Sequence, residues 1–195
     1  MGNSRLRILH VSDLHARAAR DSKRAWKRAQ VLGDAWRRNL DEITDDGHAV
    51  DIVALTGDIA DWGIEDEYRA ATSFIDATFA RLELPINRLF VVPGNHDVHR
   101  PTEIEAWRGI RQGIWSQPQA VGEWLAGASS VPFGFADEWA EAIMRRERAF
   151  WRWLSHDLGR DDLLPKNSPH ARLGYRTSMD MPGGPAPVSI IGLVY

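Results

Sequence analysis

The 195-residue sequence carries a net charge of −3, is 44% hydrophobic and 26% charged, and contains no cysteine. This composition is typical of a soluble globular protein and excludes a disordered chain. The absence of cysteine excludes disulfide bonds, a thiolate zinc site and a cysteine nucleophile, so metal ligands must be oxygen atoms or imidazoles. No apolar run approaches the roughly 20 residues of a membrane-spanning helix, and no signal peptide is recognisable, so we expect a cytoplasmic protein.

The first half of the chain predicts alternating strands and helices. Three short apolar runs are expected to be strands: residues 7–12, 51–58 and 88–93. Helices are expected at residues 22–43 and 65–82, where apolar residues recur every three or four positions. This strand–helix–strand–helix–strand order implies a parallel sheet with right-handed crossovers.

The second half of the chain has a different character. Residues 98–170 are rich in tryptophan, are interrupted by glycine and proline, and contain one expected helix at about residues 136–158. We interpret this region as a helical cap or insertion within a single domain that spans residues 1–195. Two strand-like runs, residues 171–181 and 187–195, are joined by a Pro-Gly-Gly-Pro turn and predict a hairpin.

Basic residues are concentrated near the N-terminus. Residues 1–40 contain ten lysines and arginines but only three acids. A solvated helix face explains such a cluster, and so does attraction of a phosphate-bearing substrate. The position of the cluster relative to the functional site decides between the two explanations.

Polar residues directly follow each of the three predicted strands. Asp13 and His15 follow the first strand, Asp58 follows the second, and Asn95 and His96 follow the third. Ligands bind outside the carboxyl ends of the strands in open α/β sheets, so these side chains should converge. In extended backbone Asp13 and His15 would point to the same side and could bind one cation together. Asp58 could bridge two cations, and Asn95 could offer its amide oxygen to the second.

The stretches "SDLHA", "LTGDIAD" and "VVPGNHDV" resemble the motifs of the calcineurin-like metallophosphoesterases, which read Asp-x-His, Gly-Asp and Gly-Asn-His-Asp. The stretch "GDIADWGIEDEY" is similar to the bacterial branch of that family. The resemblance covers about residues 7–97. It implies a layered α/β metallophosphoesterase-like sandwich with a βαβαβ start and a helical cap inserted at residues 98–170.

The resemblance also implies an activity and a set of roles. The activity is metal-dependent hydrolysis of phosphoester bonds, of the phosphodiesterase or nuclease-like type, with a nucleotide or nucleic acid among the candidate substrates. Two divalent ions are implied, and manganese, iron and zinc are the candidates. His96 would be the acid that helps the leaving oxygen depart, and Asp97 would orient the His96 imidazole. The implied metal ligands are Asp13, His15, Asp58 and Asn95.

The sequence departs from the family pattern after the cap. The family has a histidine at the end of a later strand and a Gly-His-x-His motif near its last strands, and nothing in this sequence matches either. We therefore expect the chain to be the N-terminal part of the fold, truncated at its C-terminus, with an incomplete second metal site. Two alternative functions follow: a catalytically silent or weakly active binding or sensing module, and an adaptor that binds nucleic acid through its basic residues.

Several further polar residues have weaker motif context. His99 and Arg100 follow the third motif and could contact a phosphate or lie in a solvated loop. Asp61 could lie beside the metal ligands or cap the next helix. His10, on the first strand, is expected in the core or between two layers of the fold. The remaining histidines have no motif context: His48, His156 and His170.

Overall fold

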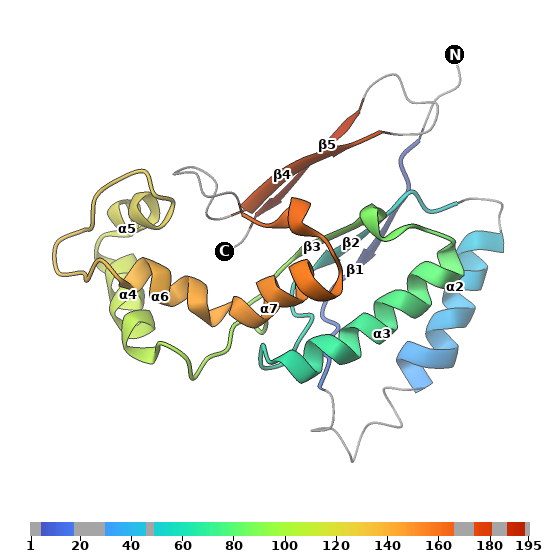
Figure 1. The fold of residues 1–195 in the computed structure, drawn as a ribbon, viewed down its shortest axis with the longest axis horizontal. Helices are drawn as coiled ribbons and strands as arrows, with labels where there is room; N and C mark the ends of the chain where they lie inside the picture. Colours follow the sequence, from blue (N-terminus) through green and yellow to red (C-terminus); the bar gives the residue numbers. More distant parts are fainter. Residues whose placement is uncertain (1–4, 18–29, 46–48, 166–173, 181–186, 194–195) are drawn as a thin grey trace.

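The computed structural model describes residues 5–17, 30–45, 49–165, 174–180 and 187–193. Its centre is a parallel sheet in the order β1-β2-β3, formed by β1 (Ile8–Val11), β2 (Ile52–Thr56) and β3 (Leu89–Val92) (Figure 1). Ile8 pairs with Ile52, and Val53 pairs with Leu89. The three predicted strands and their parallel order are confirmed.

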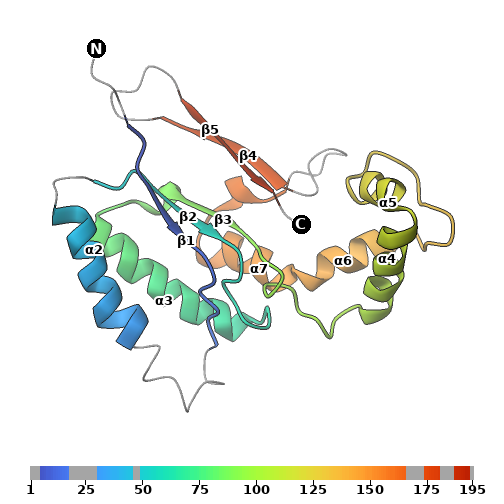
Figure 2. The ribbon, with the colours of Figure 1, turned by 180° about the vertical axis from the view of Figure 1, so that it is seen from behind.

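Two helices lie side by side along one face of this sheet, α2 (Trp36–Asp45) and α3 (Glu65–Leu82) (Figures 1 and 2). A π-helical turn (Gln30–Ala35) precedes α2. The bounds of α3 match the prediction. Tyr68, Ala71, Ile75 and Phe79 are buried along one side of the helix, as the sequence pattern indicated. The helix expected at residues 22–43 is found from residue 30 onward, and its first part lies outside the described residues.

A hairpin of β4 (Gly174–Met179) and β5 (Val188–Leu193) lies on the other side of the sheet from α2 and α3 in both views (Figures 1 and 2). The two strands are antiparallel, as predicted, and the expected Pro-Gly-Gly-Pro turn lies outside the described residues. β5 contacts β3, and Tyr175 of β4 is buried in the main core.

The expected position of His10, in the core or between two layers, is wrong. His10 is exposed, and its Nε2 lies 2.6 Å from the hydroxyl of Thr56. The reason is that β1 is an edge strand whose residues are alternately exposed, and Ile8 on the same face is 52% exposed.

The region between β3 and β4 contains more helices than the sequence indicated. They are α4 (Ile104–Ser116), α5 (Pro118–Leu125), α6 (Trp139–Arg146) and α7 (Arg148–Arg152), with a π-helical turn at Trp153–Asp157 and a short 3-10 turn at Asp161–Leu163. Another 3-10 turn, Ile86–Arg88, directly precedes β3. α4 and α5 were missed, and the helix expected at 136–158 is interrupted at Glu147. No helix among the described residues is long and apolar enough to cross a membrane.

This helical region divides between two cores. Ile110, Val121, Trp124 and Ala140 form a small core between α4, α5 and α6. Phe150 and Trp153, in contrast, belong to the main core, where the Trp153 ring stacks on Tyr68 of α3 at a centroid distance of 5.1 Å. The region is therefore anchored to the sheet domain through α7.

Glu147, at the junction of α6 and α7, is a buried acid with an altered pKa. Its side chain is 8% exposed and accepts a hydrogen bond of 3.0 Å from Trp151 Nε1. Burial raises the pKa of Glu147 from 4.5 to about 7, and the negative charge of Asp97 adds to this effect. The folded state therefore holds this proton more tightly than the unfolded chain does.

We expect the free energy of unfolding to fall as the pH rises from 5 to 8. A raised carboxyl pKa contributes stability that is complete below the unfolded pKa and lost as the pH passes the folded pKa, here on the order of 3 kcal/mol. Urea unfolding at several pH values measures this slope. Glu147→Gln should flatten it, whereas Glu105→Gln, which removes an exposed carboxylate, should not. An unchanged slope in Glu147→Gln would contradict the assignment.

Candidate metal centre

The loops that follow the three strands are joined by backbone hydrogen bonds. The amide of His15 donates to the carbonyl of Asp58 at 2.7 Å, and the amide of Gly57 donates to the carbonyl of Val92 at 2.9 Å. The parallel pairing of the sheet thus continues beyond the strands. As a result, polar side chains from three distant parts of the sequence lie at one end of the sheet.

Three of the predicted ligands have left-handed backbone conformations. The φ angles of Asp13, His15 and Asp58 are 56°, 44° and 51°. Such conformations are costly for residues other than glycine and concentrate at functional sites. The extended backbone expected for Asp13 and His15 is wrong, because His15 turns to pair with the loop after β2. Their side chains nevertheless meet, with Asp13 Oδ1 3.9 Å from His15 Nε2.

Gly94 allows the loop after β3 to approach the loop after β2. A Cβ atom at Gly94 would lie 2.4 Å from the amide nitrogen of Asp58 and 2.9 Å from the Cα of Gly57, so only glycine fits. This approach brings the amide of His96 to Asp58 Oδ1, to which it donates at 2.9 Å.

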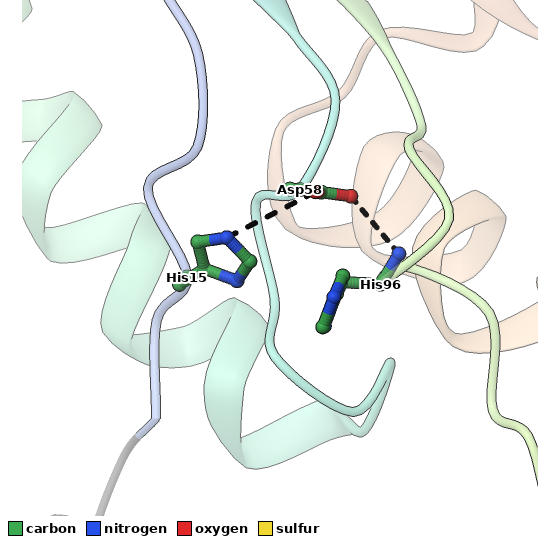
Figure 3. Close-up of side chains that lie close together, drawn as sticks. All are labelled: His15, Asp58 and His96. Carbon is green, nitrogen blue, oxygen red and sulfur yellow. Dashed lines mark hydrogen bonds and ion pairs between the residues drawn. The ribbon is translucent and has the colours of Figure 1, made fainter.

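His15, Asp58 and His96 form a compact cluster (Figure 3). One possible ligand atom from each lies within 4.8 Å of the others. His15 Nε2 is 3.9 Å from Asp58 Oδ2, and the two imidazole rings meet edge to face at 4.7 Å. Metal–ligand bonds of about 2.0–2.2 Å allow two ligands of one ion to lie up to about 4.4 Å apart. The His15 contacts with Asp13 and Asp58 therefore fit a shared cation.

Comparison with known families agrees with this geometry. The sequence profile of the calcineurin-like phosphoesterase family matches residues 6–178. The chain belongs to this family. The family expected from the sequence motifs and the mixed α/β fold are thus both confirmed. A comparison with curated protein sequences finds no match.

In this phosphoesterase-family chain, Asp61 contacts both histidines of the cluster. Its Oδ1 lies 3.3 Å from His15 Nδ1, and its backbone carbonyl is 2.9 Å from His96 Nδ1. Its carboxylate also pairs with Arg17, at 3.1 Å from Nε. Asp61 therefore lies beside the predicted ligands and does not cap the next helix, since the N-cap of α3 is Ile64.

The buried side chain of Glu67 supports this loop and was missed by sequence reasoning. Its Oε2 accepts hydrogen bonds from the amides of Asp61 at 3.3 Å and Trp62 at 2.8 Å. Glu67 occupies the third position of α3, from which a glutamate commonly reaches back to amides before a helix. The position of Glu67 in the first turn of the predicted helix could have indicated this role.

Asp97 makes contacts that differ from those expected. Its buried carboxylate accepts hydrogen bonds from three backbone amides, those of Ile59, Ala60 and Gly94, at 2.8–3.1 Å, and from the Tyr68 hydroxyl at 3.0 Å. Burial raises the pKa of Asp97, and these hydrogen bonds lower it in part. The partner of the His96 imidazole is the carbonyl of Asp61 instead. Asp97 faces inward because buried amides of the loops need an acceptor.

The remaining candidates are Asn95, the N-terminal basic residues and the other histidines. Asn95 is exposed in the turn before His96. Among the described residues of the N-terminal basic cluster, Arg17 contacts this centre, whereas Arg37 of α2 pairs with Asp34 of the preceding π-helical turn. His99 Nδ1 lies 2.7 Å from the Thr102 hydroxyl. His156 lies in the π-helical turn after α7. Outside the described residues lie His48, His170, Arg20, Lys23, Arg24, Lys27 and Arg28.

Proposed function

We propose that this chain hydrolyses phosphoester bonds with two divalent metal ions. Asp13, His15 and Asp58 would hold the first ion, and Asp58 and Asn95 would contribute to the second. One observation carries the proposal: the Asp58 carboxylate lies between two loops, with one oxygen 3.9 Å from His15 Nε2 and the other accepting the His96 amide at 2.9 Å. Family membership over residues 6–178 supports the same activity.

The ions would activate the attacking water and offset the charge on the phosphoryl oxygens. The chain itself would position the proton donor. Because His96 Nδ1 lies 2.9 Å from the carbonyl of Asp61, the proton of a neutral imidazole resides on Nδ1. Nε2 is then the nitrogen that can exchange a proton with the leaving oxygen. Asp97 would act on His96 indirectly, by holding the backbone of the loop.

We favour a phosphodiester substrate that carries an aromatic group, such as a nucleotide. Trp62 is 47% exposed and follows Asp61 directly, on the loop whose carbonyl contacts His96. An exposed aromatic ring beside a phosphate-binding site would be able to stack on the base of a nucleotide. Of the cap tryptophans, Trp124 and Trp153 are buried in cores, so they support the fold and not a pocket.

Hydrolysis of bis-(p-nitrophenyl) phosphate tests the proposal. We expect release of p-nitrophenol with manganese, its loss with EDTA and its recovery when the metal is restored. A parallel assay with the monoester p-nitrophenyl phosphate tests the preference for diesters. A background rate with manganese, iron and zinc alike would refute the enzyme and favour a silent binding module.

A further inference from the structure

Arg100 places a positive charge against the proposed proton donor. Its NH2 group lies 3.3 Å from His96 Nε2, the nitrogen that would face the leaving oxygen. Arg100 is exposed, and no carboxylate of the described residues forms an ion pair with it. The acid three residues later, Glu103, pairs with Arg145 at 2.8 Å instead. The charge of Arg100 is therefore uncompensated within the described part of the chain.

Arg146, the last residue of α6, hydrogen-bonds to the backbone at residues 99 and 100. The buried guanidinium of Arg146 donates to the carbonyl of Arg100 at 3.2 Å, and the carbonyl of Arg146 accepts the amide of His99 at 2.9 Å. Arg146 itself stacks over the Trp107 ring of α4 at 4.8 Å. The helical region thus fixes the backbone from which the Arg100 side chain extends toward His96.

Arg146 is the second arginine near this part of the site, and it differs from Arg100 in its burial. Arg146 is 4% exposed. Burial lowers the pKa of Arg146, and the positive charge of Arg100 lowers it further, whereas Glu147 raises it. Glu147 therefore offsets the charge of Arg146, and the exposed Arg100 is the arginine of this pair that an anion can reach.

We propose that Arg100 binds the phosphoryl oxygens of the substrate and thereby determines substrate affinity, an inference that rests on the proposed function. A guanidinium can donate two parallel hydrogen bonds to a phosphate, which are stronger than its contact with a neutral imidazole. When the phosphoryl group binds, Arg100 turns from His96 Nε2 to the phosphate. Nε2, which faces the guanidinium donor in this structure and so carries no proton, can then take up a proton from water and pass it to the leaving oxygen, so substrate binding and charging of the proton donor are coupled.

Substitution of Arg100 tests whether this residue affects substrate binding more than the rate of the chemical step. We expect Arg100→Gln to raise KM for bis-(p-nitrophenyl) phosphate by about 10- to 100-fold, as loss of a hydrogen bond to a charged group predicts, with a smaller change in kcat. Inhibition by inorganic phosphate should weaken to a similar degree, and Arg100→Lys should restore part of both. Arg108→Gln is the matched control, because it removes an exposed arginine from α4.

A second measurement is independent of turnover. In the metal-free chain, titration with inorganic phosphate should move the nitrogen NMR resonance of His96 Nε2 as Arg100 leaves it, and Arg100→Gln should abolish that movement. Unchanged KM and phosphate inhibition in Arg100→Gln, beside an active wild type, would overturn the role of Arg100. If the wild type does not hydrolyse the diester, the proposed function fails, and the NMR titration still decides whether Arg100 binds phosphate.

Discussion

Asp58→Asn should weaken binding of a divalent metal more than any other single substitution in the candidate centre. Its carboxylate faces His15 Nε2 with one oxygen and accepts the His96 amide with the other, so it joins the loops that follow β1 and β3. Asparagine preserves the shape and one acceptor oxygen but removes the charge. Removal of a residue that only hydrogen-bonds to a metal ligand lowers metal affinity by roughly 10- to 100-fold. We expect Asp58→Asn to lower manganese affinity by more than this, and to lower the rate of hydrolysis at least as far.

Isothermal calorimetry with manganese measures this effect, and His96→Ala is the informative comparison. If His96 acts on the substrate, its removal should lower turnover and leave metal affinity within about tenfold of the wild type. Asp76→Asn removes an exposed carboxylate from α3 and should change neither quantity. If Asp58→Asn retained manganese and His96→Ala lost it, the two roles would be reversed. The comparison is needed because His96 lies in one cluster with His15 and Asp58.

The elements predicted correctly are those with uninterrupted hydrophobic periodicity. In α3 the apolar residues recur over 18 residues without glycine or proline, and the predicted bounds match the structure. α4 and α5 were missed because Gly109 and Gly113 lie inside α4, and Pro118, which begins α5, follows α4 closely. Those glycines serve packing: a Cβ at Gly113 would lie 1.8 Å from the Phe135 ring. Periodicity cannot separate such a packing glycine from a helix-breaking one.

The site was predictable to the extent that its side chains follow strands. The ends of parallel strands meet at one edge of the sheet, and this rule correctly brought His15, Asp58 and His96 together. The partner of the His96 imidazole could not be predicted in this way, because it is the backbone carbonyl of Asp61, a group that every residue possesses. Likewise, Asp97 was expected beside the imidazole, whereas unsatisfied amides in the neighbouring loop determine where its carboxylate points.

Asp97→Ala should destabilise the fold by about 3–5 kcal/mol or more. The substitution removes the acceptor of three backbone amides, those of Ile59, Ala60 and Gly94, and of the Tyr68 hydroxyl. Each buried donor left without a partner costs about 1–3 kcal/mol. Asp97→Asn should cost less, since it keeps one acceptor oxygen and removes a charge whose burial is unfavourable. Urea unfolding in EDTA measures both variants without a contribution from bound metal.

The comparison of stability with turnover decides what Asp97 does. If it holds the loops, the two variants should lose turnover in the order of their loss of stability, and Asp137→Ala, which removes an exposed acid, should change neither. If Asp97 instead acts directly on His96, Asp97→Asn should abolish turnover at nearly wild-type stability. The contacts favour the first outcome, because the carboxylate of Asp97 is directed to the amides of the β2 and β3 loops, while His96 Nδ1 is already bonded to Asp61.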